Sequence, residues 1–450
     1  MKLDGKLLFS DLTSQISMIE QGEISANELF AMQLSFNEKI NPLVNAFISL
    51  DDSNQVIKDN DSALHGVAIA VKDNIDVDGF NTTAGLEILR HNRPHEDAFS
   101  VAKLRAAGAS FIGKLNMHEG ALGASNHNAH FGNCYNPHNI ELTPGGSSGG
   151  SGAAVAAGMT ALALGTDTMG SVRIPASYCG VFGFKGSKGA ISNRGSVPCG
   201  RSLDNIGPLA RSARDLTLAF TLMQGHDVQS AQSLSINYAA PNEQLPTILI
   251  PKDLSVFSVD SDVIDDFERN IDTFAQMGCR LKSVDFSGYD FSAARRAGLI
   301  ICEADMRLTH QQAWQDSPDL FSPYLRNLLR YIDGKTPMDV MRAEQTIEAA
   351  VVMANQLFND GDMLLMPTAP QRAFAMNADV PANQADLTGF ANMAGLPALS
   401  MPMISDRPLP AGMQLVGPSG SDLQILAIAE RWQQSTGFSC DIPSAISAFI

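Results

Sequence analysis

Three residues that could together make a serine nucleophile stand in short motifs far apart in the chain. Lys72 follows the apolar run VAIAV (67–71), Ser147 stands in TPGGSSGGSGAAVAAG (143–158), and Ser171 closes GTDTMGS (165–171). A hydroxyl attacks poorly until a base removes its proton. A buried lysine can be that base, because a low dielectric disfavours its charged form, and a second serine can relay the proton. The nearby glycines would let backbone amides approach a developing oxyanion.

The glycine-serine stretch also fits three other interpretations, which the surrounding residues disfavour. A flexible linker would continue into polar sequence, whereas 152–158 is made of tiny apolar residues and a strand-like run follows. A phosphate loop needs Lys-Ser or Lys-Thr after the glycines, and neither is there. Residues 145–149 fit the G-x-S-x-G nucleophile elbow, but the preceding NPHNIELTPGG is a poor strand.

The elements that must position these residues alternate between strand and helix. A capping box at SANE (25–28) predicts a helix to about residue 37, and DAFSVAKLRAAGA (97–109) predicts another. Strands are predicted at VAIAV, SFIGK, ALALG, PTILIP, DMLLMP and MQLVGP, with helices at 262–277 and 421–434. This alternation predicts an α/β fold with helices on both faces of a sheet. The motif-poor segment 225–361 is expected to wall a substrate cavity.

Seven motifs, in order, resemble those of the amidase signature family. They are GVAIAVKDNIDVDGFNTTAG, IGKLNMHEGALG, TPGGSSGGSGAAVAAG, LALGTDTMGSVRIPASYCGVFGFK, SLDNIGPLARSARDL, MLLMPTAP and GFANMAGLPALSMP, which together span 66–402. The resemblance implies one domain over 1–450, with a central mixed β-sheet covered by helices. It also implies that Lys72 is the base, that Ser147 bridges through a cis peptide, and that Ser171 is the nucleophile.

The resemblance further implies a substrate-binding loop around the nucleophile. The backbone amides of Thr168, Met169, Gly170 and Ser171 would hold the oxyanion, and Met117 would line the cavity or pack in the core. The family usually has glycine where this chain has Met169, so Met169 is expected to shape substrate choice. A second departure, Lys185-Gly186-Ser187 in place of Lys-Pro-Thr, lies beyond the three catalytic positions and is expected to change a turn.

The implied activity is hydrolysis of a carboxamide or urea-like C–N bond through an acyl-enzyme, with a small-molecule substrate and no cofactor or metal. An alternative is the glutamine-hydrolysing A subunit of a tRNA-dependent amidotransferase, which SLDNIGPLAR also resembles; Ile174 and the chain length speak against it. A third possibility, a non-catalytic scaffold, is disfavoured by the intact lysine and serines. The acyl group, the leaving amine and the oligomeric state, including a homodimer, stay open.

Composition narrows the range of partners and compartments. The 31 basic and 48 acidic residues give a net charge of −17, which would repel nucleic acid and anionic membranes. The start of the chain lacks a signal-peptide core, so a cytoplasmic protein is expected. Six scattered cysteines without a CxxC pair are expected to be free thiols. Residues His118, His127, His130, Cys134 and His138 cluster in sequence but match no zinc template.

Overall fold

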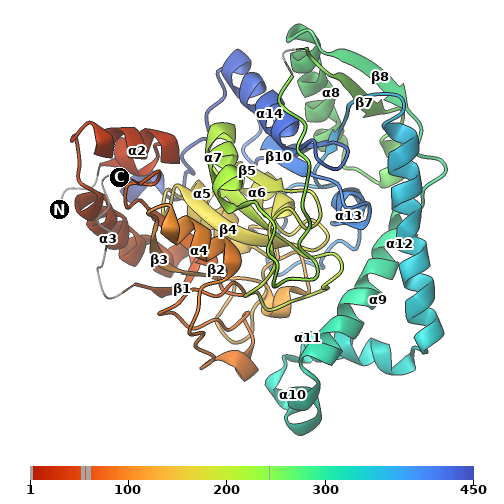
Figure 1. Cartoon of the computed structure of the whole chain (residues 1–450), viewed down its shortest axis with the longest axis horizontal. Coiled ribbons are helices and arrows are strands. Elements are labelled where there is room, and N and C mark those ends of the chain that lie inside the picture. Colours follow the sequence, from red (N-terminus) through yellow and green to blue (C-terminus); the bar gives the residue numbers. More distant parts are fainter. Residues whose placement is uncertain (1–3, 52–55, 57–61, 243, 450) are drawn as a thin grey trace.

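One mixed β-sheet runs through the whole protein (Figure 1). The computed structural model describes residues 4–51, 56, 62–242 and 244–449. Within them, eleven strands form a single sheet in the order β1-β3-β2-β4-β6-β5-β10-β11-β9-β7-β8. The strands are β1 (Phe47–Leu50), β2 (Ala68–Lys72), β3 (Ser110–Leu115), β4 (Leu162–Asp167), β5 (Phe182–Lys185), β6 (Asn205–Ala210), β7 (Thr247–Pro251), β8 (Arg280–Val284), β9 (Met363–Pro367), β10 (Ala398–Pro402) and β11 (Gly412–Val416).

The helices cover this sheet and extend beyond it at one side, where α9–α12 lie (Figure 1). They are α1 (Gly5–Leu8), α2 (Leu12–Glu20), α3 (Ala26–Val44), α4 (Phe99–Ala106), α5 (Gly149–Ala156), α6 (Arg173–Cys179), α7 (Ala213–Met223), α8 (Ser261–Gln276), α9 (Phe291–Thr309), α10 (Gln311–Asp316), α11 (Pro323–Arg330), α12 (Pro337–Leu357), α13 (Asp386–Met393) and α14 (Asp422–Thr436). The predicted α/β fold around one central mixed sheet is confirmed.

The strand pairing brings two of the sequence motifs to one edge of the sheet. Strand β2 lies between β3 and β4 and pairs with both in parallel. Every residue of β2 and β4 is buried, as expected for strands covered on both faces. Since parallel strands end at the same edge, the last residue of β2 and the loop after β4 lie together.

Helix α5 closes over this edge because its residues are small. It packs against β2, β3, β4 and β6, and all eight of its residues are buried. A side chain at Gly150 would collide with the backbone oxygens of Asn116 and Ala46, so only glycine allows this approach. The described residues directly before the glycine-serine loop do not form a strand, in agreement with the rejection of the nucleophile elbow.

One predicted helix boundary needs correction, and the segment 225–361 contributes more than the expected cavity wall. The helix capped by Ser25 does not end near residue 37 but continues to Val44, because Ile40 and Val44 extend its buried face, and it ends where Asn45 adopts the left-handed conformation. The segment 225–361 is not only a wall around a cavity. Its β7, β8 and α8 extend the sheet at the far edge, whereas α9 and α11 reach the cavity described below.

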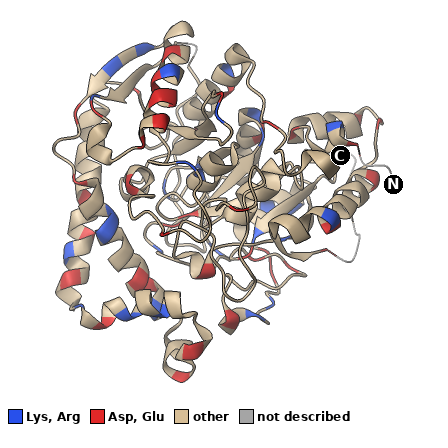
Figure 2. Cartoon of the chain, turned by 180° about the vertical axis from the view of Figure 1, so that it is seen from behind, with Lys and Arg blue, Asp and Glu red and all other residues tan. Residues whose placement is uncertain are grey.

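Acidic and basic residues are spread over the elements seen in Figure 2, but helix α8 carries five acidic residues and one arginine. None of the described helices is long and apolar enough to cross a membrane. All six cysteines are unpaired.

Candidate active site

Lys72 lies at the end of β2 with its ammonium group inside the protein. Its side chain is fully buried, and Nζ donates to Ser147 Oγ and to Thr166 Oγ1, each at 2.7 Å. Burial lowers the pKa of Lys72 to about 7, against smaller opposing effects of Cys199, Asp204 and Asp167. A lysine with this pKa is partly neutral near pH 7, which a general base requires.

Ser147 lies in the loop that leads into α5, and the peptide bond between Gly146 and Ser147 is cis, as the family resemblance implies. The Ser147 carbonyl accepts from the His118 amide at 3.0 Å. The next residue, Ser148, donates its amide to the Ser171 carbonyl at 3.2 Å and its hydroxyl to the Thr166 carbonyl at 3.1 Å. These bonds join the glycine-serine loop to the end of β4.

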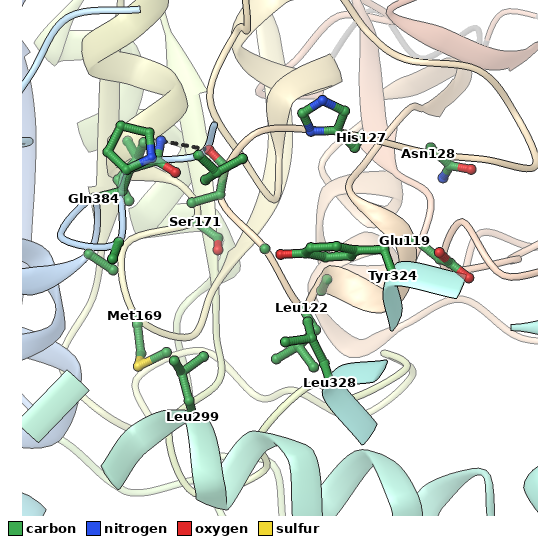
Figure 3. Close-up of a pocket in the computed structure, with 18 of the residues that line it drawn as sticks. Glu119, Leu122, His127, Asn128, Met169, Ser171, Leu299, Tyr324, Leu328 and Gln384 are labelled. Atoms are coloured by element: carbon green, nitrogen blue, oxygen red, sulfur yellow. Dashed lines mark hydrogen bonds between the residues drawn. The ribbon is translucent and has the colours of Figure 1, made fainter. Parts of the chain in front are cut away.

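Ser171 follows β4 and lines a cavity of about 950 Å³. Its relative exposure is 9%, whereas Lys72 and Ser147 behind it are at 0%. Figure 3 shows Ser171 between Met169 and Gln384 on one side and Tyr324 on the other. Of the three predicted catalytic residues, Ser171 alone meets the space where a substrate could sit, and the structure joins the other two by a hydrogen bond.

The loop before Ser171 is held by the carboxylate of Asp167. Asp167 accepts from the Gly170 amide at 2.7 Å and the Val172 amide at 3.2 Å, and from Arg173 Nε and Nη2 at 3.0 Å each. Burial would raise the pKa of Asp167, but Arg173 outweighs it and lowers that pKa to about 2. The expected structural role of Asp167 and Arg173, bonding to loop amides and to each other, is therefore what the structure has.

This arrangement narrows the set of amides that could bind an oxyanion. The Gly170 amide is already used by Asp167, which the sequence did not reveal. In the described part of the chain, the amides of Thr168, Met169 and Ser171 have no hydrogen-bond acceptor. Gly170 has a φ of 128°, a conformation that favours glycine, and a side chain there would collide with Thr388.

The two methionines singled out from the sequence lie in different places. Met169 lines the cavity and is partly buried. Met117 is fully buried in the core and does not line the cavity, so core packing is the correct interpretation of that residue. The sequence could not separate the two, because both follow short polar motifs.

The two histidines near this site differ in their hydrogen bonds, since the buried Nδ1 of His118 has no partner among the described residues. His127 lines the cavity and its ring nitrogens contact Ser125 Oγ at 2.7 Å and the Met376 carbonyl at 2.8 Å. Burial, with smaller effects of His127 and Lys72, lowers the pKa of His118 to about 3, so its ring is neutral. Among the described residues, no group of three His, Cys, Asp or Glu side chains could hold a metal ion.

Sequence reasoning missed several residues of the site. Thr166, the second hydroxyl on Lys72, lies within the GTD motif, but its contact depends on the pairing of β2 with β4. Leu299 on α9, and Tyr324 and Leu328 on α11, form the wall opposite Ser171 (Figure 3) and belong to no motif. Only the placement of these helices beside the cavity reveals them.

Comparison with known proteins places this chain and its fold in one class. The Amidase family profile matches residues 35–426. The A subunit of the glutamyl-tRNA(Gln) amidotransferase of Thermus thermophilus is 33% identical, over 93% of this chain and 95% of its own. A chain from a vestigial protein complex, described as revealing the evolutionary origins of an s-triazine catabolic enzyme, is similar at a TM-score of 0.86, with 28% identity over 96% of this chain and 99% of that one. A bacterial aryl acylamidase shares the fold at a TM-score of 0.89 and 21% identity, covering 98% and 99% of the two chains.

The chain belongs to the amidase signature family. It is accordingly an amidohydrolase that acts on C–N bonds.

Proposed function

We propose that this protein hydrolyses the C–N bond of an uncharged carboxamide or urea-like compound through an acyl-enzyme on Ser171. Neutral Lys72 Nζ takes the proton of Ser147 Oγ, and Ser147 Oγ takes the proton of Ser171 Oγ. Ser171 Oγ bonds to the carbonyl carbon, and the oxyanion accepts from free loop amides such as those of Met169 and Ser171. The proton returns by the same route to the departing nitrogen, and water then cleaves the Ser171 ester.

The observation that carries this proposal is the hydrogen bond of 2.7 Å between Lys72 Nζ and Ser147 Oγ. Burying the charged form of a lysine costs free energy, which lowers the pKa of Lys72. The amine is therefore partly neutral near pH 7 and can accept a proton. Ser147 is then the hydroxyl through which the buried amine can reach the cavity-lining Ser171.

The charges around the cavity favour an uncharged substrate. Of the described residues that line the cavity, Arg295 is the only lysine or arginine. Its Nε donates to the carboxylate of Asp386. The other charged side chains there, Glu119 and Asp379, are acidic. A substrate carboxylate would therefore meet no unpaired cation, and its desolvation would be poorly compensated.

A second candidate is the release of ammonia from glutamine within an amidotransferase complex. The 33% identity to the Thermus thermophilus amidotransferase chain, along nearly the whole length, favours it, and the same serines and lysine would serve. The structural neighbour from a protein complex makes a partner protein worth testing. The cavity charges speak against it, since the carboxylate of glutamine would meet no unpaired cation among the described lining residues.

The test is ammonia release by the isolated protein from hexanamide, urea and glutamine, and aniline release from acetanilide, compared by kcat/KM. Hydrolysis of the uncharged amides well above glutamine supports the first proposal, and glutamine as the best substrate would favour the second.

The nucleophile is tested separately with a fluorophosphonate and mass spectrometry. The adduct is expected on Ser171 and absent in Ser171→Ala. Ser151→Ala is the matched control, because Ser151 is a buried serine of α5 whose hydroxyl donates to the Leu164 carbonyl at 2.9 Å. An adduct on Ser147 instead would mean that the roles are misassigned.

A further inference from the structure

Resting on the proposed hydrolysis, we propose that Gly298 in α9 sets the depth of the acyl-binding end of the cavity by giving Met169 room against the helix. Met169 lies two residues before the proposed nucleophile and lines the cavity. Figure 3 shows its side chain leaving the loop in the direction of α9, beside Leu299. Gly298 and Met169 thus form the contact between the proposed oxyanion loop and that helix.

Gly298 occupies the interior of α9, a helix of 19 residues, where glycine is among the least favourable residues. Its backbone does not require glycine, because its φ lies outside the left-handed range. The space is filled instead by two flexible side-chain ends: a Cβ at position 298 would lie 2.6 Å from Met169 Sδ and 3.0 Å from Met393 Cε. The next nearest atom, Leu203 Cδ1, would be at 3.8 Å, so these methionine ends are what a side chain at position 298 would displace.

The backbone of Met169 cannot shift easily to relieve such a collision. Its carbonyl accepts from Thr388 Oγ1 at 2.6 Å, and the following Gly170 amide is held by Asp167 at 2.7 Å. The thioether can rotate, because methionine is unbranched and flexible. With α9 behind it, a methyl group at position 298 would turn Met169 into the cavity.

The neighbours of this contact are apolar. Leu299 and Ile174 line the cavity together with Met169. The part of a substrate bound there would gain by burying hydrocarbon, so an aliphatic or aromatic acyl group fits this end. The depth of the end then decides which acyl length reacts fastest.

The experiment compares the rates at which methyl and octyl fluorophosphonate label Ser171. These probes place their alkyl chain where the acyl group would lie. Wild type is expected to favour the octyl probe, and Gly298→Ala to lower the octyl-to-methyl ratio by about tenfold or more. Met169→Ala is expected to raise the ratio, and the double variant Met169→Ala with Gly298→Ala to match Met169→Ala alone.

Gly389→Ala in α13 is the matched control. A Cβ there would lie 3.5 Å from the same Met393 Cε and near no atom of Met169, so the ratio should stay at the wild-type value. An octyl-to-methyl ratio that is unchanged in Gly298→Ala overturns the inference. So does a double variant whose ratio falls below that of Met169→Ala by as much as Gly298→Ala falls below wild type. If Gly298→Ala does not fold, an unchanged ratio in Met169→Ala overturns it. Absence of any Ser171 labelling in wild type would instead count against the proposed nucleophile.

Discussion

Two buried lysines end two strands of the same sheet, and only one of them is suited to catalysis. Lys72 is the last residue of β2 and Lys185 the last of β5. Both are fully buried, and burial lowers the pKa of each to about 7. By pKa alone the two would be equally good bases.

Their hydrogen-bond partners differ. Lys72 reaches two hydroxyls, those of Ser147 and Thr166, whereas Lys185 Nζ donates to the Gly186 carbonyl at 2.8 Å. A carbonyl has no proton to give, so a neutral Lys185 has nothing to activate there. Neither lysine lines a described cavity, so each amine could act only through a neighbouring hydroxyl. The comparison teaches that burial makes an amine partly neutral near pH 7, and that the amine can serve as a base only where a neighbouring hydroxyl gives it a proton to accept.

The largest expected effect is on turnover. Lys72→Met should lower kcat/KM for an amide at least about 1,000-fold, because the general base is lost. Lys185→Met should retain turnover, although methionine replaces an equally buried amine. The measurement is ammonia release, with circular dichroism to show that both variants fold. Comparable losses in the two variants would remove the functional distinction between the lysines.

The second expected effect is on the pH profile. Since the neutral form of Lys72 is the base, kcat/KM should rise about tenfold per pH unit below its pKa and level off above it. The midpoint should lie near 7, the pKa that burial gives Lys72. Lys185→Met should keep this limb unchanged. A limb that disappears in Lys185→Met, or persists in the residual activity of Lys72→Met, would contradict the assignment.

The third expected effect is on stability, where the two lysines should behave alike. Each has a folded-state pKa of about 7 and an unfolded value near 10.4, so the unfolded chain binds more protons between these values. Each lysine therefore makes the free energy of unfolding increase as the pH rises through this window, by up to about 1.4 kcal/mol per pH unit. Below pH 7 both states are protonated, and these lysines add no further change.

Denaturant unfolding of wild type and of each methionine variant between pH 7 and 10 measures this difference. Subtracting the variant curve from the wild-type curve cancels the cysteines and tyrosines that titrate in the same range. A difference that does not change with pH for either lysine would show that its pKa is not lowered in the folded protein.

The fold class and the local motifs could be predicted from the sequence, whereas most contacts between the motifs could not. Lys72 at a strand end and Ser147 before a helix were predictable, since apolar runs and glycines mark such elements. The use of the Gly170 amide by Asp167, and the packing of Met169 on Gly298, were not. Both depend on residues that meet only after the sheet and helices have assembled. Lys185 shows the same limit, because nothing in the sequence separates a buried lysine with hydroxyl partners from one without.

The smallest expected effect sharpens the comparison at Lys72 itself. Thr166 Oγ1 accepts from Lys72 Nζ at 2.7 Å and from Asn74 Nδ2 at 3.2 Å. Thr166→Val keeps the side-chain shape but removes an acceptor that stabilises the ammonium form, so the pKa of Lys72 should fall further. The rising limb of kcat/KM should move to lower pH, with a moderate loss in its plateau. Asn74 keeps its bond to the Val197 carbonyl at 3.2 Å, so the fold should hold. A shift to higher pH would mean that Thr166 donates to a neutral Lys72, and that hydroxyl would then compete with Ser147 for the base.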